Sequence, residues 1–265
     1  MTARPIPAVL SIAGSDSGGG AGIQADLKAF ARCGVHGMTA ITAITAQNTV
    51  GVRAVEAVAP ETIVAQVRAV AEDIGVDAVK IGMLGTAATV DAVVEALGFL
   101  GDAPVVIDPV MVAESGAALL DEEARRALVE RLLPLTAVAT PNIPEARELT
   151  GLGEGATQGE LARAILGLGP RAAVVTGGHS EELVDLFFDG EREVEIPGER
   201  HPDGAAHGSG CTHSSALAAF LAHGEEPLEA ARRARVVASE AVGAGLRGIG
   251  AGPGPVNALG LLFPD

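Results

Sequence analysis

The segment from His207 to Thr212, with the sequence HGSGCT, carries the residue types best suited to chemistry in this chain. Small and apolar residues at helical spacing follow it and predict a helix over residues 211–221. Glycines and a serine just before a helix present backbone N–H groups at its positive end, where phosphate oxygens bind. A cysteine at the helix start has a lowered thiol pKa, so a base and an anion cradle would share one turn. This arrangement suits phosphoryl transfer, although a glycine-rich turn that merely begins a helix is the commoner reading of such a segment alone.

A second glycine-rich segment, residues 14–22, lies between the first predicted strand and the first predicted helix. Its glycines let the backbone approach a ligand closely at the carboxyl end of a strand, where open α/β sheets bind ligands. Residues 20–25 match a dinucleotide fingerprint, but the glycines lie too far beyond the strand, and the next strand ends in amides instead of an acid. A P-loop is excluded because neither Lys28 nor Lys80 follows a glycine. A ligand site is therefore favoured over a purely structural turn.

An otherwise apolar strand ends in the side-chain amides of Gln47 and Asn48. An amide offers a donor and an acceptor side by side, which matches the edge of an aminopyrimidine or a pyridine ring. A polar turn before Gly51 explains the same residues equally well from the local sequence.

Polar residues also end three later strands. Asp108 closes a buried strand, Asn142 and Glu145 follow the next one, and Thr176 precedes the run Gly177-Gly178-His179. Carboxylates at strand ends near a phosphate site organise Mg²⁺ directly or through water, because this hard ion keeps several of its waters. Asn142 and Glu145 could equally be a turn residue and an acid in the first turn of a helix. The glycines after Thr176 would let the backbone approach a nucleotide closely.

The composition excludes several classes of function. A net charge of −16 argues against nucleic acid and anionic membranes as partners, because both attract basic surfaces. Cys33 and Cys211 are the two cysteines, without pairs or metal-ligand spacing, so we expect reduced thiols. The histidines form no zinc pattern, and no G-x-S-x-G elbow supports a serine hydrolase. Neither a signal peptide nor a membrane span is recognisable, and we therefore expect a cytoplasmic protein.

Short β-branched runs alternate with amphipathic helical patterns along the chain, which predicts an α/β fold with a mainly parallel sheet covered on both faces. Strands are predicted at 9–13, 39–45, 52–58, 78–81, 105–108, 137–140 and 173–176, with a hairpin at 183–188 and 192–196. Helices are predicted at 21–32, 61–74, 86–97, 122–132, 144–149, 161–168, 211–221 and 228–243. Asp121 is the expected N-cap of the helix that begins at 122. Since no linker or repeat divides the chain, we predict one domain over residues 1–265.

Six motifs, taken in order, closely resemble those of the hydroxymethylpyrimidine/phosphomethylpyrimidine kinases of thiamin biosynthesis. They are residues 13–28 (AGSDSGGGAGIQADLK), 46–49 (AQNT), 82–84 (GML), 108–113 (DPVMVA), 140–146 (TPNIPEA) and 208–212 (GSGCT). The resemblance implies a ribokinase-like fold, a three-layer α/β domain whose sheet is flanked by helices. It also implies that ATP phosphorylates 4-amino-5-hydroxymethyl-2-methylpyrimidine and then its monophosphate, giving the diphosphate used to make thiamin phosphate.

The same resemblance implies roles for the substrate-binding and catalytic residues. Gln47 would hydrogen-bond the aminopyrimidine. The pocket around that ring would be shaped or lined by Gly14, Ala21, Asp26, Met83 and Val110. Cys211 occupies the place where relatives in the wider superfamily carry an aspartate base. The anion hole would be formed by the backbone of Gly208, Ser209, Gly210 and Cys211, with His207 just before it.

The resemblance further implies a nucleotide site, a metal and an oligomeric state. The nucleotide-binding residues would be Asp108, Asn142, Thr176 and Gly178. Glu145 and Asn142 would organise Mg²⁺ and its waters. A homodimer is the family expectation.

The chain departs from the family pattern at three places. Glu114 and Thr176 stand where the family usually has lysines, and Ala205-Ala206 stands where it has Asn-Thr. The lysines would be expected to neutralise phosphate charge or contact the nucleotide, so their loss bears on ATP affinity and on the second phosphorylation. Mg²⁺, the helix terminus or an arginine could compensate.

Two other readings compete with the pyrimidine kinase. A pyridoxine or pyridoxal kinase has the same fold and a Gly-Ser-Gly-Cys arrangement that can hold a pyridine ring. A pyrimidine- or nucleotide-binding protein without catalysis is conceivable because the lysines are missing, although the retention of Cys211, Asn142 and Glu145 speaks against it.

Overall fold

One nine-stranded sheet gathers strands from along the whole chain, in the order β3-β2-β1-β4-β5-β6-β7-β8-β9. The computed structural model describes residues 4–261 except 113–115, 117–118, 179–182 and 203. The strands from β2 to β7 in this order run parallel, whereas β3, β8 and β9 pair antiparallel at the two edges. The strands are β1 (Ala8–Asp16), β2 (His36–Asn48), β3 (Gly51–Ala57), β4 (Ala78–Ile81), β5 (Val105–Ile107), β6 (Val138–Ala139), β7 (Ala172–Val175), β8 (Val184–Phe188) and β9 (Glu193–Pro197).

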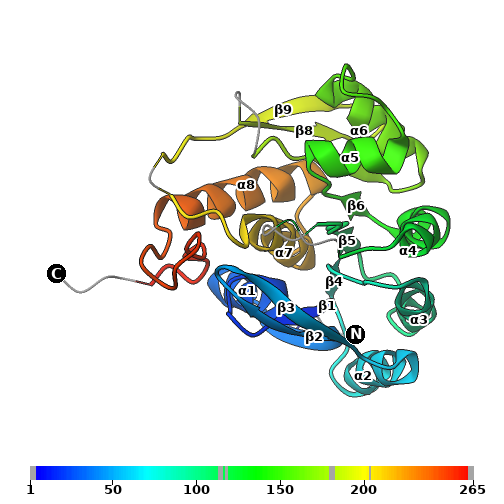
Figure 1. Cartoon of the computed structure of the whole chain (residues 1–265). Coiled ribbons are helices and arrows are strands. Elements are labelled where there is room, and N and C mark those ends of the chain that lie inside the picture. Colours follow the sequence, from blue (N-terminus) through cyan, green and yellow to red (C-terminus); the bar gives the residue numbers. More distant parts are fainter. Residues whose placement is uncertain (1–3, 113–115, 117–118, 179–182, 203, 262–265) are drawn as a thin grey trace.

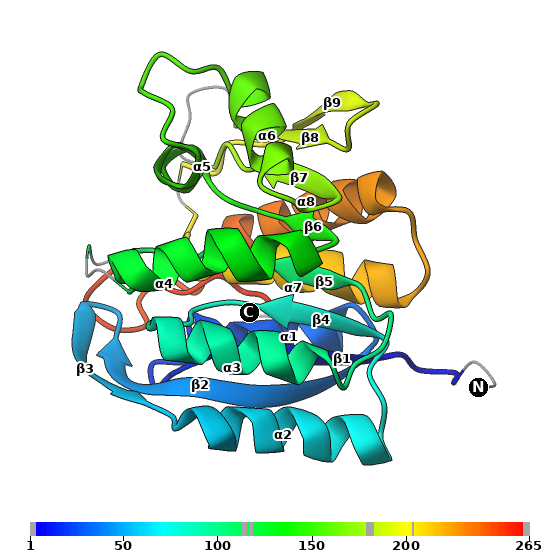
Figure 2. The same ribbon diagram turned by 90° about the vertical axis from the view of Figure 1, so that its right-hand side faces the viewer.

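Helices cover both faces of the sheet, so the molecule has three layers (Figure 1). On one face lie α1 (Gly22–Arg32), α7 (Ser209–Ala222) and α8 (Pro227–Gly243). On the other face lie α2 (Pro60–Asp73), α3 (Ala87–Leu97), α4 (Glu122–Ala127), α5 (Ile143–Thr150) and α6 (Gln158–Gly167). In Figure 2, α3 and α4 lie in front of β4 and β5, with α7 behind them. This layering confirms the ribokinase-like α/β fold that the sequence predicted.

The core is built almost entirely from aliphatic side chains, as the near absence of aromatic residues requires. Leu10, Ile12 and Ile81 of the parallel strands are fully buried between the two helical layers. Each such side chain contributes about 1.5–3 kcal/mol of burial free energy relative to exposure. Strands that are buried on both faces consist of continuous apolar residues, and for this reason they could be predicted from the sequence.

Helix α7 is the most buried helix in its layer and contacts both α1 and α8. All of its residues from Thr212 to Leu221 are buried, and most are alanine, serine or leucine. Small side chains let neighbouring helices approach closely. The first turn of α7 is therefore held rigidly at the carboxyl edge of the parallel strands.

The predicted elements are confirmed, with small differences at their ends. Helix α7 begins at Ser209, two residues before the predicted start, so Cys211 is its third residue. The helix predicted at 122–132 is α-helical only to Ala127 and continues as a π-helix over Leu128–Leu132. Asp121 caps it as expected, because its carboxylate accepts the N–H of Ala124 at 2.7 Å. Among the described residues, no helix is both long enough and apolar enough to span a membrane.

Candidate active site

Asp16, the last residue of β1, organises the glycine-rich loop that follows it. One carboxylate oxygen accepts the N–H of Gly18 at 2.7 Å, and the other accepts those of Gly20 and Ala21 at 3.0 and 2.9 Å. The His207 ring nitrogen lies 3.4 Å from the second oxygen. Burial acts to raise the pKa of Asp16, but these hydrogen bonds outweigh it and hold the pKa below its ordinary value. Asp16 was not among the predicted site residues, although an Asp at the head of a glycine run is a common turn signal.

Gln47 is tied to the glycine-rich loop by a reciprocal pair of hydrogen bonds. The Ser17 hydroxyl donates to the Gln47 carbonyl at 2.7 Å and accepts the Gln47 N–H at 2.8 Å. The Thr45 hydroxyl donates to the Ser15 carbonyl at 2.9 Å and lies 3.3 Å from the Gln47 amide oxygen. The half-buried amide thus lies beside the loop, where the sequence placed the substrate ring.

Two further predicted pocket residues, Gly14 and Met83, are in contact. A Cβ atom built on Gly14 would lie 3.4 Å from the Met83 sulfur. Ala21 is the N-cap of α1, and its N–H is held by Asp16. Val110 follows β5, with its N–H bonded to the Asp108 carbonyl at 2.8 Å. These residues all lie at the carboxyl edge of the parallel strands.

The segment before α7 packs directly onto the glycine-rich loop. Gly208 has φ +86°, and a Cβ atom there would lie 1.9 Å from the Gly20 carbonyl oxygen. A side chain at Gly208 is excluded by both the positive φ and this contact. Gly20 is equally restricted, because a Cβ atom on it would lie 2.3 Å from the His207 ring.

The predicted anion hole has fewer free backbone N–H donors than expected. The Ser209 N–H donates to the Ala206 carbonyl at 2.9 Å, so Ser209 does not supply a free donor as expected. The Thr212 N–H bonds the Gly208 carbonyl at 2.9 Å. For Gly210 and Cys211, no such hydrogen bond occurs among the residues that the structure describes, which leaves these two N–H groups for an anion. They lie at the positive end of α7.

Cys211 does not have the lowered pKa that its place at a helix start predicted. Removal from water raises the pKa of the thiol to about 12, and the Asp26 and Asp108 carboxylates act in the same direction. The opposing influences are the charge of Lys80 and a hydrogen bond from the Gly22 N–H to the sulfur. The prediction was wrong because it counted the helix terminus and not the burial around it.

Asp26, which was predicted to shape or line the substrate pocket, has a side chain fully buried in a polar cluster beneath the site. Lys80 lies 2.9 Å from one carboxylate oxygen, which also accepts the Ser215 hydroxyl at 2.8 Å. The Ser11 hydroxyl donates to the other oxygen at 2.6 Å. Burial alone would lower the pKa of Lys80, but Asp26 chiefly, with Cys211 and Asp108, holds it well above its ordinary value. Asp26 therefore holds a buried ammonium ion and contacts no solvent.

Asp108, Asn142 and Glu145 follow β5 and β6, whereas the glycine-rich loop follows β1. The Asp108 carboxylate lies 3.3 Å from the Ser214 hydroxyl, whose nearest acceptor is the Gly210 carbonyl at 2.9 Å. A Cβ atom on Gly210 would lie 3.7 Å from the same carboxylate oxygen. Burial raises the pKa of Asp108, against the charge of Lys80. Asp108 thus adjoins the first turn of α7.

Asn142 and Glu145 form a capping box at the start of α5. The Asn142 side chain accepts the Glu145 N–H at 2.9 Å, and the Glu145 carboxylate accepts the Asn142 N–H at 3.0 Å. Burial and the neighbouring Asp108 carboxylate raise the pKa of Glu145 to about 8, although the N–H groups of Asn142 and Met111 bond to it. The local geometry is therefore that of the alternative interpretation, in which these residues begin a helix.

The strand end after β7 joins this group. The Thr176 N–H donates to the Pro141 carbonyl at 2.9 Å, and Thr176 forms an isolated parallel β-bridge with Asn142. The Gly177 N–H donates to the buried Asp185 carboxylate at 3.0 Å, and Gly178 is exposed. Glu114 and His179 lie outside the described residues.

The donor set fits Mg²⁺ only as an ion held largely through water. No cluster of three or more His, Cys, Asp or Glu side chains able to hold a metal occurs in the described part of the chain. Asp108 and Glu145 nevertheless place two carboxyl groups close enough to raise the pKa of Glu145, and a cation would relieve this repulsion. Oxygen donors and retained waters are what Mg²⁺ prefers.

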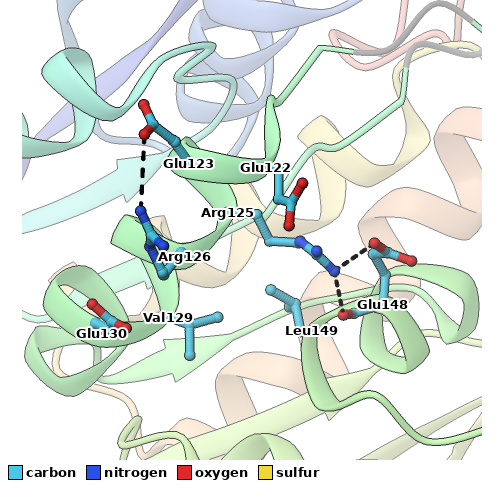
Figure 3. A pocket seen from close by; sticks show the side chains of 8 residues that line it. All are labelled: Glu122, Glu123, Arg125, Arg126, Val129, Glu130, Glu148 and Leu149. Carbon is cyan, nitrogen blue, oxygen red and sulfur yellow. Dashed lines mark hydrogen bonds and ion pairs between the residues drawn. The ribbon is translucent and has the colours of Figure 1, made fainter.

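A surface groove between α4 and α5 contains none of these residues (Figure 3). Arg125 donates to the Glu148 carboxylate at 2.5 Å and to its carbonyl at 3.1 Å. Arg126 forms a second ion pair with Glu123, and none of the residues predicted for the active site lines the groove. Its lining residues are Glu122, Glu123, Arg125, Arg126, Val129, Glu130, Glu148 and Leu149.

Comparison with known proteins identifies the family to which this arrangement belongs. The family model described as phosphomethylpyrimidine kinase matches residues 16–257. A hydroxymethylpyrimidine/phosphomethylpyrimidine kinase of Rhizobium meliloti is 51% identical over 254 residues, covering 94% of this chain and 95% of that protein. The crystal structure of phosphomethylpyrimidine kinase from Clostridium difficile is 42% identical, with a TM-score of 0.79 over 89% of this chain and 99% of that one.

A second enzyme of known structure is also similar. The pyridoxal kinase from Staphylococcus aureus in complex with AMP-PCP and pyridoxal is 32% identical, with a TM-score of 0.88 over 97% of this chain and 94% of that one. This pyridoxal kinase has the higher TM-score but the lower sequence identity. The family model and the sequence relative both carry the name phosphomethylpyrimidine kinase. The chain therefore belongs to the phosphomethylpyrimidine kinase family.

Proposed function

We propose that this chain uses ATP to phosphorylate 4-amino-5-hydroxymethyl-2-methylpyrimidine and then its monophosphate, in the biosynthesis of thiamin. The observation that carries this proposal is the row of groups at the carboxyl edge of the sheet. It runs from the Gln47 amide, through the free N–H groups at the start of α7, to the Asp108 and Glu145 carboxyl groups. This order supplies a ring-recognition site, an anion hole and a cation site in sequence, as phosphoryl transfer requires.

The pyrimidine is held on the β1-β2 side of the row. Gln47 pairs with the aminopyrimidine edge, and Gly14 and Met83 lie side by side next to the ring. Asp16 fixes the loop backbone from Gly18 to Ala21 around it. The hydroxymethyl group then faces the start of α7.

At the reacting centre, the hydroxymethyl oxygen forms a bond to the γ-phosphorus while the bond to the ADP oxygen breaks. The N–H groups of Gly210 and Cys211 stabilise the charge on the transferred group, since they lie at the positive end of a rigid helix. Cys211, as thiolate, accepts the hydroxymethyl proton. The loose transition state of phosphoryl transfer needs that proton removed late, so positioning and charge stabilisation contribute more than the base.

The nucleotide is held on the β5-β7 side. Thr176 and Gly178 lie beside its phosphates, with Asp108 and Asn142 next to them. Glu145 and Asn142 hold the waters of Mg²⁺, which when bound neutralises charge on the phosphate oxygens. The enzyme works in the cytoplasm, as a homodimer.

Pyridoxal phosphorylation is the second candidate activity, and the similarity to the Staphylococcus aureus pyridoxal kinase supports it. The test is a mass-spectrometric product assay with Mg-ATP and four acceptors: hydroxymethylpyrimidine, its monophosphate, pyridoxine and pyridoxal. We expect phosphorylation of the first two at kcat/KM values well above those of the pyridoxine compounds. Preferential phosphorylation of pyridoxal would replace the proposed function, and binding without any product would indicate a non-catalytic protein.

A further inference from the structure

Lys80 is a buried charge that the reaction outlined above does not use. It is one of only two lysines in the chain, and its side chain is fully buried in a protein with a net charge of −16. Burying an ammonium ion is costly unless it is paired and fully hydrogen-bonded. Replacing such a pair with apolar residues is often neutral or stabilising, so stability alone is a weak reason for it.

The position of the ammonium group ties it to the active site. Lys80 lies on β4, and a Cβ atom built on Gly82, just beyond the end of this strand, would lie 2.9 Å from the Lys80 nitrogen. The side chain therefore extends toward the carboxyl edge of the sheet. That edge carries the anion hole.

Helices α1 and α7 connect the Lys80–Asp26 ion pair to Cys211, which lies one helical turn away from it. At the start of α1 and α7, the Gly22 N–H bonds to the Cys211 sulfur. Four residues further along each helix, Asp26 accepts the Ser215 hydroxyl at 2.8 Å. Residues four apart lie on the same helix face, so the Asp26-Ser215 contact is the next layer beneath the Gly22-Cys211 contact. Lys80 pairs with Asp26 in that lower layer.

We infer that Lys80 is a positioning residue, whose buried positive charge stabilises the anionic form of the Cys211 sulfur one helical turn above it. The charged or titratable groups that face Cys211 are Lys80 from β4, Asp26 from α1 and Asp108 after β5. Lys80 is the one cation among them, and it is the largest influence opposing the burial of the thiol. Asp26 holds the ammonium ion in place and also weakens its effect.

This inference deepens the proposed function and rests on Cys211 lying at the reacting centre. Its test measures the thiol directly and needs no turnover. In a Cys33→Ser background, Cys211 is the only cysteine, and its alkylation by iodoacetamide can be followed by mass spectrometry from pH 6 to pH 10. Lys80→Met, Asp26→Asn and the double variant are compared with this background.

The electrostatic role predicts opposite signs for the two single variants. Lys80→Met removes the cation and slows alkylation. Asp26→Asn removes the opposing carboxylate and accelerates it, because Asp108 and the thiolate itself still keep Lys80 protonated. One pKa unit changes the thiolate fraction about tenfold, and the accompanying change in nucleophilicity offsets almost half of this on a logarithmic scale. We therefore expect rate changes of about threefold or more, with the double variant slower than Asp26→Asn.

A purely structural role predicts that both single variants change alkylation in the same direction, by loosening the same cluster, and this result would overturn the inference. Lys28→Met is the matched control, because it removes the other lysine, which bonds to the Gly19 carbonyl at 2.6 Å and forms no pair with Asp26. It should leave the profile unchanged. If Lys80→Met does not fold, as judged by circular dichroism, the comparison of Asp26→Asn with the double variant still decides the sign.

The two proposals can fail separately. Alkylation that does not respond to Lys80 would end this inference and leave the product assay untouched. A product assay that finds no pyrimidine kinase activity would end the proposed function, whatever the alkylation rates.

Discussion

Gly22 and Cys211 meet where helices α1 and α7 begin, with the Gly22 N–H bonded to the Cys211 sulfur. Two helix N-termini therefore converge on one thiol, and both favour negative charge there. Burial opposes them and prevails, because it raises the pKa of the thiol to about 12. The proposed mechanism therefore assigns more of the catalysis to fixed backbone donors and buried charges than to an intrinsically acidic cysteine.

Gln47→Ala tests the recognition of the pyrimidine. Removing one partner of a buried polar pair costs about 1–3 kcal/mol, or about 5- to 150-fold in affinity. We expect a KM for hydroxymethylpyrimidine raised within this range, with ATP binding nearly unchanged because the proposed nucleotide site follows β5 to β7, away from Gln47 on β2. Calorimetric titrations that found weaker ATP binding and unchanged pyrimidine binding would contradict the assignment.

The fold could be predicted closely because its signals are local. Buried parallel strands are continuous apolar runs, and caps such as Asp121 mark helix starts, so most ends differ from the prediction by only a few residues. The π-helix at Leu128–Leu132 was missed because a single wide turn has no distinct hydrophobic period. The start of α7 was placed at Cys211 because glycine and serine resemble a turn.

The site was predictable only in part. Motifs at strand ends meet at one edge of a parallel sheet, and for this reason Gln47, Asp108 and Asn142 could be placed there from sequence. The pairing of Lys80 with Asp26 could not be predicted. The two residues are 54 positions apart, and the local sequence around each does not show that its charge is buried. The raised pKa of Cys211 depends on this same packing.

Gly208→Ala and Gly210→Ala form a matched pair of tests of the loop before α7. At Gly208 a methyl group would meet the Gly20 carbonyl at 1.9 Å on a backbone with φ +86°, whereas at Gly210 it would meet Asp108 at an ordinary 3.7 Å. The left-handed backbone alone costs a side chain about 1–2 kcal/mol. Gly208→Ala should lower Tm by several degrees in calorimetry and Gly210→Ala by much less. Equal Tm values would mean that the loop adapts freely.

Thr176→Lys tests the effect of the missing lysine on the second phosphorylation. The monophosphate brings extra negative charge beside ATP in a protein whose net charge is −16. A lysine at this position, adjoining Asn142, should improve turnover of the monophosphate more than turnover of the free alcohol. Steady-state kinetics with both acceptors measure the ratio. Equal improvement, or a larger one for the alcohol, would remove this electrostatic explanation.

Glu145 should make stability and Mg²⁺ binding depend on pH. Its pKa rises from 4.5 to about 8 on folding. Between these values the folded protein binds more protons than the unfolded chain, so the free energy of unfolding should fall as pH increases without Mg²⁺. Denaturant titrations of Glu145→Gln should lose this slope. Because the cation competes with the proton, Mg²⁺ should bind the wild type more tightly at pH 8 than at pH 6; an unchanged affinity would indicate that the ion does not sit beside Glu145.

Cys211→Ser tests the base directly. Serine keeps the size of the side chain and raises its pKa further, and positioned proton transfer contributes about 10²- to 10⁴-fold to a rate. Because proton removal is late, we expect kcat to fall toward the lower end of that range, while ATP and the pyrimidine still bind. Wild-type kcat should increase with pH as the thiolate fraction grows below its pKa of about 12, and the serine variant should lack this increase. Cys211→Asp restores the usual base of the wider superfamily and should retain more activity than serine, provided that Lys80 offsets its charge. Near wild-type turnover of Cys211→Ser with the same pH profile would show that Cys211 is an inert helix residue and that the anion hole performs the catalysis.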